Sequence, residues 1–149
     1  MDKAIIKEVM DDIRLDTHDL DAVWRRQPEL VAIYGFKQVE AESAANAAKR
    51  DLESIEARLY STTRAGLSFD GVKISESTIE AKIKSAPAYL SARQKYDDAK
   101  YLAEFYKQVV NALGHRRDMI VQASKKAISE YERTGVERFN ALKMYLDNK

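Results

Sequence analysis

The sequence of 149 residues holds five glycines, two prolines and no cysteine, and its formal net charge is +1. This composition excludes disulfides, thiolate metal ligands and a cysteine nucleophile, and it disfavours strand-rich folds, which need more turns. The charge is uneven, because residues 1–30 carry eight acidic and five basic side chains. We therefore expect an acidic N-terminal arm joined to a mildly basic body.

Residues 1–27 are expected to form that arm as two short helices. An apolar stripe at helical spacing runs through its first part and consists of Ile5, Ile6, Val9, Met10 and Ile13. Thr17 and Asp19 are typical of a helix start, and Pro28 should end the helix that follows, because the residue before a proline avoids the helical region. No apolar leader precedes the arm, and no stretch reaches the roughly 18 consecutive apolar residues of a membrane span. We expect a cytoplasmic protein without membrane contact.

Residues 28–64 predict one long helix with a coiled-coil seam. The seam recurs at steps of three, four or seven residues and consists of Leu30, Tyr34, Ala41, Ala45, Ala48, Leu52, Ile55 and Leu59. Its middle is alanine, so a partner helix can approach closely there. Residues 65–75 contain two glycines and lose the helical period, which predicts an ordered loop or small hairpin. Residues 77–80 match a capping box, which opens a short helix ending near Lys84.

From Pro87 the sequence predicts a second long helix of about 45 residues, on the order of 65 Å. Its seam alternates aromatic and small residues at heptad spacing, and Arg117 falls on it, which predicts a buried or interfacial ion pair for that side chain. A second apolar stripe flanks the seam, so this helix must contact more than one neighbour. The expected fold is all-α and oligomeric, a single domain whose residues 28–134 form a long coiled-coil-like hairpin or bundle.

Gly135 predicts a break before a short C-terminal helix over residues 136–149. The apolar face of this helix is wide for its length and consists of Val136, Phe139, Leu142, Tyr145 and Leu146. Such a helix either folds back on its own subunit or docks on another one, and its residues leave both alternatives open.

The residue types that catalysis needs are not arranged for it. His18 and His115 lie far apart and outside any metal-ligand spacing, and no glycine-rich phosphate-binding motif or nucleophile elbow occurs. Adjacent acids such as Asp11 and Asp12 point about 100° apart on a helix, so they do not converge on a metal ion or a shared proton. We expect no enzyme activity, no cofactor and no metal.

A cluster of lysine and arginine side chains around the end of the first long helix favours binding of single-stranded nucleic acid. Phosphates neutralise such side chains, and nucleotide bases stack on an aromatic ring among them. The predicted binding residues are Lys49, Arg50, Arg58, Tyr60, Arg64, Lys73 and Lys82. The alternative is that these basic side chains form ion pairs along the helix with Asp51, Glu53 and Glu56, whose spacing permits it.

The order of these segments resembles the UvsY-like recombination mediators of tailed phages. The likeness covers roughly residues 15–125 and is best in Ile-Glu-Ala-Arg-Leu-Tyr (55–60) and His-Arg-Arg-Asp-Met-Ile-Val-Gln (115–122). It implies a ring-like homo-oligomer in the cytoplasm of a phage-infected bacterium. Such a protein binds single-stranded DNA and helps a RecA-type recombinase displace the single-strand-binding protein.

The resemblance also implies roles for particular segments. Arg58 matches a basic residue that contacts DNA in the family, and the C-terminal helix matches the segment that mediates assembly. Glu56 stands where the family has a second base, so Arg64, Lys49 and Lys73 are the residues that can compensate for it. Two functions of other classes stay open: a structural or scaffolding phage protein, and a small helical inhibitor of a host enzyme.

Overall fold

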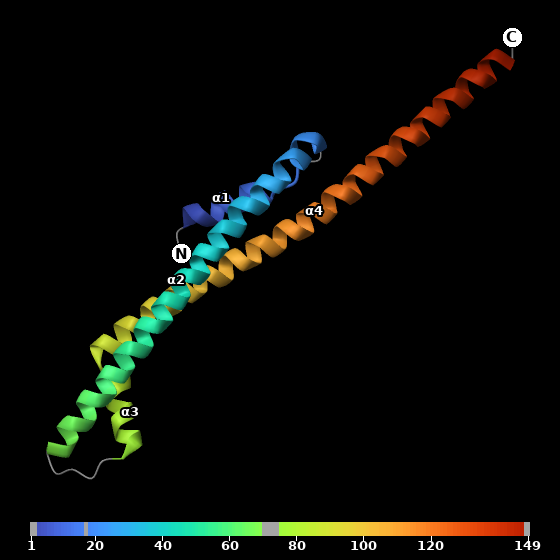
Figure 1. Ribbon diagram of the computed structural model, residues 1–149. Helices are drawn as coiled ribbons and strands as arrows, with labels where there is room; N and C mark the ends of the chain where they lie inside the picture. The colour runs from blue at the N-terminus through green and yellow to red at the C-terminus, as the bar shows by residue number, and fades with distance from the viewer. Residues whose placement is uncertain (1–2, 17, 70–74, 148–149) are drawn as a thin grey trace. The chain divides into compact units, whose positions relative to one another are not determined.

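A computed structural model describes residues 3–16, 18–69 and 75–147, and the described part of the chain is all helical, without a strand. Its four helices follow one another along the chain as α1 (Lys3–Ile13), α2 (Leu20–Phe69), α3 (Glu76–Ser85) and α4 (Pro87–Asp147) (Figure 1). The chain divides into two compact units. We call Met1–Ile33 with Val109–Lys149 the terminal unit and Tyr34–Gln108 the central unit.

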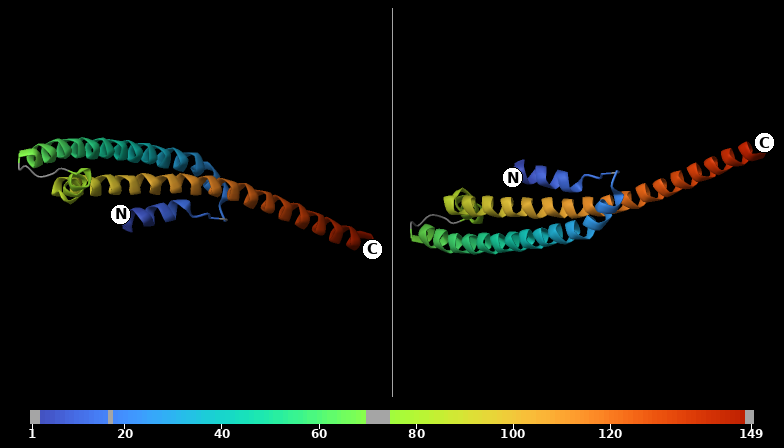
Figure 2. Two further views of the ribbon diagram at one scale, coloured as in Figure 1. Left: turned by 90° about the horizontal axis from the view of Figure 1, so that it is seen from below. Right: turned by 90° about the horizontal axis from the view of Figure 1, so that it is seen from above.

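The central unit is an antiparallel hairpin of α2 and α4, as the two seams predicted. Both views of Figure 2 show these parts of the two helices side by side. The buried residues between them include the alanines Ala41 and Ala45 of α2 and Ala92 and Ala103 of α4. Small side chains let the helix backbones approach closely. Tyr34 and Tyr106 lie at one end of the seam, with their ring centroids 6.4 Å apart.

Helix α3 covers the other end of the hairpin in the central unit. Ile79 and Ile83 are buried and pack against Leu59, Tyr60 and Tyr89. A short helix over this segment is confirmed, but its first turn is capped by Ser75, whose hydroxyl accepts a hydrogen bond from the Thr78 amide at 3.3 Å. The predicted cap at Ser77 is therefore wrong by two residues, because Ser75 is the residue that has extended backbone.

The terminal unit joins α1, the first part of α2 and the second part of α4. Its buried apolar side chains are Val9, Val23, Leu30, Val109, Leu113 and Ile120. Two polar side chains, Gln27 and Arg116, are buried among them. The first of the two short helices predicted within residues 1–27 is confirmed as α1, and Asp19 caps α2 by accepting a hydrogen bond from the Ala22 amide at 3.0 Å. Thr17 lies outside the described residues.

The predicted helix ends at Pro28 and at residue 64 are wrong, because α2 runs through both. Pro28 removes one helical hydrogen bond, at a cost of about 3 kcal/mol. Val23, Gln27 and Leu30 nevertheless lie on one buried face, and its packing holds the helix continuous across the proline. Residues 65–69 belong to α2, and residues 70–74 of the predicted loop lie outside the described residues.

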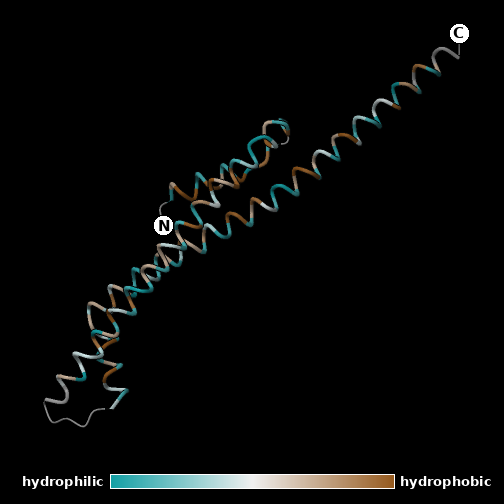
Figure 3. Tube along the Cα trace, viewed as in Figure 1, coloured by the Kyte–Doolittle hydropathy of each residue, from teal (hydrophilic) through white to brown (hydrophobic). Residues whose placement is uncertain are grey.

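The predicted break at Gly135 is also wrong, since the C-terminal segment is the last part of α4. Glycine inside a helix costs only about 1 kcal/mol relative to alanine, which many flanking helical residues offset. From residue 125 to residue 140 every side chain of α4 is exposed. Hydrophobic positions still recur along this part of α4, as the brown bands of Figure 3 show.

Candidate nucleic-acid interface

The predicted DNA-binding residues of α2 lie on two different flanks of the helix. Residues two positions apart on an α-helix point about 200° apart, so Arg58 and Tyr60 face nearly opposite sides. Arg58 is exposed and lines a groove between α2 and α4, whereas Tyr60 lies against α3. The structure therefore does not bring all of these residues to one site.

Tyr60 and Arg64 come together on the flank that faces α3. The Tyr60 hydroxyl donates to the Glu76 carboxylate at 3.2 Å and accepts from Arg64 at 3.2 Å, and the guanidinium carbon lies 6.0 Å from the ring centroid. Part of the Tyr60 ring is packed on the Ile79–Ile83 cluster. This arrangement ties Tyr60 into the hairpin end and places an acid beside Arg64, which opposes the approach of a phosphate.

The other predicted basic residues that the structure describes are Lys49, Arg50 and Lys82. Lys49 forms an ion pair with Glu53 at 3.8 Å, one of the pairs along the helix that the sequence permitted. Arg50 and Lys82 are exposed and make no ion pair with any residue that the structure describes. Lys73 lies outside the described residues.

The groove beside Arg58 brings together basic side chains from two helices. It has a volume of about 410 Å³ and is lined by Ala48, Asp51, Ser54, Ile55 and Arg58 of α2 and by Ala88, Ser91, Ala92 and Lys95 of α4. The alanines leave the groove open, while Arg58, Lys95 and the two serine hydroxyls supply donors at its rim. Asp51 is its one acidic lining residue.

Sequence reasoning missed Lys95, Ser54 and Ser91 as partners of Arg58. Lys95 is 37 positions away along the chain, and only the register of the hairpin brings it to Arg58. Arg93 lies two positions away on α4 and is paired: its guanidinium donates to Asp97 at 3.0 Å, an interaction that raises the pKa of Arg93. No described residue forms an ion pair with Lys95 or with Arg58.

A buried polar network lies in the terminal unit. Arg116 donates to the Ile13 carbonyl at 3.1 Å and to the Gln27 side-chain oxygen, and Gln27 donates to the Leu113 carbonyl at 2.7 Å. Burial lowers the pKa of Arg116, and the nearby charge of Arg26 lowers it further. The network joins α1, α2 and α4 by hydrogen bonds to the backbone carbonyls of Ile13 and Leu113 and by one between the side chains of Arg116 and Gln27.

The predicted buried ion pair of Arg117 is wrong. Arg117 is exposed and bonds its neighbour Asp118 at 2.8 Å, and Arg116 is the residue that is buried. A step of one residue rotates the side chain by about 100° around the helix, which is enough to exchange the two roles.

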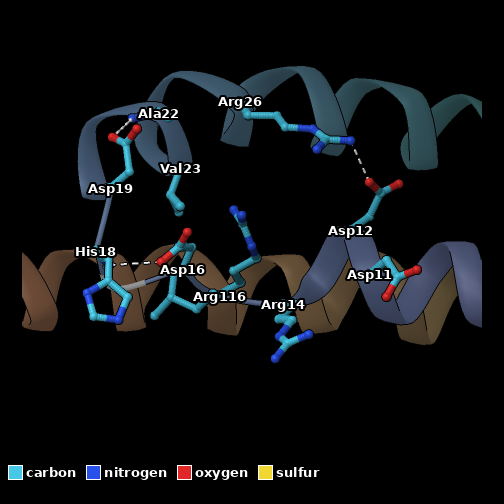
Figure 4. A pocket seen from close by; sticks show the side chains of 11 residues that line it. Asp11, Asp12, Arg14, Asp16, His18, Asp19, Ala22, Val23, Arg26 and Arg116 are labelled. Carbon is cyan, nitrogen blue, oxygen red and sulfur yellow. Dashed lines mark hydrogen bonds and ion pairs between the residues drawn. The ribbon is translucent and has the colours of Figure 1, made fainter.

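The surface next to this network carries charges of both signs. A pocket of about 690 Å³ is lined by four acids, Asp11, Asp12, Asp16 and Asp19, and three arginines, Arg14, Arg26 and Arg116 (Figure 4). Arg26 bonds Asp12 at 2.6 Å, and the amide of His18 donates to Asp16 at 2.9 Å. Since acids and arginines line the pocket together, it offers no field of one sign to a nucleic acid.

Comparisons with protein families, with curated proteins and with solved structures found no match to this chain. In the described ranges, no helix combines the length and apolar character that crossing a membrane requires. The same residues contain no group of three or more His, Cys, Asp or Glu side chains placed to hold a metal ion.

Proposed function

We propose that this chain is a non-catalytic protein that binds single-stranded DNA as an assembly of copies, in the cytoplasm of a phage-infected bacterium. It loads a RecA-type recombinase onto DNA coated with single-strand-binding protein. The observation that carries the proposal is the groove of the central unit, where Arg58 and Lys95 reach one open surface from two helices.

The chemistry of that groove suits a phosphate backbone. A guanidinium donates two parallel hydrogen bonds to a phosphate, and a lysine ammonium adds a compact charge beside it. Ser54 and Ser91 provide neutral donors that bind phosphate oxygens without regard to sequence. One groove of this kind is a weak site, so useful affinity comes from several copies that hold one strand together.

The mediator part of the proposal rests on the resemblance in residues 55–60 and 115–122. Contacts to the backbone leave the bases exposed, and a recombinase needs access to those bases. Displacement of the single-strand-binding protein then follows from competition for the same phosphates. The acidic side chains of residues 1–30 are the proposed contact for one of these two protein partners.

Binding is tested with a fluorescently labelled oligo(dT) in an anisotropy titration across a salt series. We expect Arg58→Ala and Lys95→Ala each to weaken binding several-fold. Each should also make the negative slope of log K against log salt shallower by about one, because one phosphate contact is lost. Arg93→Ala is the matched control, because Arg93 lies two positions from Lys95 on α4 and is already paired with Asp97. Equal binding by all three variants and the parent protein would contradict the proposal.

Loading is tested by following recombinase filament formation on DNA coated with single-strand-binding protein. We expect the parent chain to shorten the lag and Arg58→Ala to lose most of that effect. An assembled protein that ignores DNA even at low salt would instead support a scaffolding function. The exposed apolar positions of α4 are the observation that favours this second candidate.

A further inference from the structure

The terminal unit carries an apolar groove between α2 and α4. It has a volume of about 550 Å³ and is lined by Trp24, Gln27, Pro28 and Val31 of α2 and by Val110, Leu113, Gly114 and Arg117 of α4. Trp24 is 54% exposed and Val31 is 41% exposed. A groove of this size and character is typical of a surface that receives an amphipathic helix.

Gly114 makes the α4 wall of this groove low. A Cβ atom added at Gly114 would meet no atom within 4 Å, so the space above the glycine is open. A glycine on a helix surface lets another helix approach its backbone closely. The groove is therefore shaped for a helix rather than for a single side chain.

The same helix carries an apolar stripe that is exposed in the described part of the chain. Ile128, Tyr131, Phe139 and Leu142 lie on one face of α4 at steps of three, eight and three residues, and all four are at least 58% exposed. The stripe continues the face of Ile120, which is fully buried in the terminal unit. Val136 flanks it and is 59% exposed.

The stripe cannot reach the groove of its own copy. Gly114 and Phe139 lie 25 positions apart on one continuous helix, which separates them by about 38 Å. A stripe that fills the groove must therefore belong to another copy. Both surfaces belong to the terminal unit, both are apolar, and no residue that the structure describes covers either of them.

We propose that the groove around Gly114 receives the Phe139–Leu142 part of α4 from a second copy of this chain. The contact is head-to-tail, because the groove of one copy meets the stripe of the next. Contacts of this type close into a ring when the rotation between copies permits it and otherwise continue as a filament. This inference deepens the assembly that the proposed function requires, and it assigns the docking surface that the C-terminal residues contact.

Two variants test the groove and the stripe independently. Gly114→Leu fills the groove with a side chain that has open space in the monomer, and it replaces glycine by a stronger helix former, so the folded monomer is not destabilised. Phe139→Glu places a charge on the stripe at an exposed position, which leaves the monomer fold intact. Circular dichroism checks that both variants are folded.

The experiment is analytical ultracentrifugation with Trp24 emission as a second readout, since Trp24 is the only tryptophan in the chain. We expect the parent protein to assemble with rising concentration while the Trp24 emission shifts to the blue. Each variant alone should self-associate at least about tenfold more weakly. A mixture of the two should form dimers, because the intact stripe of Gly114→Leu docks in the intact groove of Phe139→Glu.

Three results would overturn the proposal: a parent protein that stays monomeric, a Gly114→Leu variant that assembles normally, or a mixture that forms no dimer. The second result would mean that stripes pair with stripes. DNA binding is measured separately through Arg58 and Lys95 in the central unit. A failure of head-to-tail docking can therefore be told apart from a failure of the DNA-binding proposal.

Discussion

The terminal unit and the central unit bury different kinds of side chain where their helices meet. In the central unit the contact is a row of alanines with large residues at its ends, and its buried side chains include no amide and no charged group. In the terminal unit Gln27 and Arg116 are buried together, and their hydrogen bonds link three helices. The first contact depends on side-chain size, and the second depends on hydrogen bonds, so the two units should respond to different substitutions.

The largest effect is expected at Arg116. Arg116→Leu keeps apolar bulk but removes the donor to the Ile13 carbonyl and to Gln27, which leaves buried acceptors unpaired. We expect a loss of about 3 kcal/mol in the free energy of unfolding of the terminal unit. Urea denaturation followed by Trp24 emission measures this at concentrations where the chain is monomeric.

Arg117→Leu is the matched control for that experiment. Arg117 is adjacent and exposed, and its ion pair among the described residues is with its neighbour Asp118 at 2.8 Å. Its replacement should change the free energy of unfolding by no more than about 0.5 kcal/mol. Equal losses at both positions would mean that the buried network does not hold the terminal unit together.

A smaller effect is expected at the alanine seam of the central unit. Ala45→Leu inserts a larger side chain where the two helices are close, and the overpacking should cost about 1–3 kcal/mol. Thermal unfolding followed by far-UV circular dichroism measures it. Ala47→Leu provides the comparison, because Ala47 is exposed on the same helix and should be nearly neutral. A stabilised Ala45→Leu variant would show that the seam is not closely packed.

The smallest effect is expected at Gly135. Whether Gly135→Ala stabilises or destabilises the helix distinguishes a continuous α4 from one that ends at this glycine. An added Cβ meets no atom within 4 Å at this position, so Gly135→Ala should stabilise the helix by up to about 1 kcal/mol. The measurement is the midpoint of thermal unfolding of the C-terminal helix by circular dichroism. A glycine that ended the helix in a left-handed conformation would instead make the alanine variant less stable.

Most of the candidate DNA interface could be predicted only as a set of basic residues, without the arrangement that makes them a site. Helical spacing shows that Arg58 and Tyr60 cannot share a face, but it does not show which face meets a partner helix. Lys95 joins Arg58 through the register of the hairpin, which depends on contacts across 37 positions of the chain. Nothing near Arg58 in the sequence points to Lys95.

The sequence by itself determined the all-helical fold, the two long seams and the short helix before Pro87, because these follow from local periodicity. Tertiary structure decided where the helices end, since packing outweighs the local cost of Pro28 or Gly135. It also decided that Arg116 and not Arg117 is buried. Val109, Leu113, Arg116 and Ile120 are the buried positions of α4 in the terminal unit, and they lie on the face that packs against α1 and α2. Apolar residues occupy two adjacent faces of this helix, so helical spacing alone does not distinguish them, and the neighbouring helices select the face that is buried.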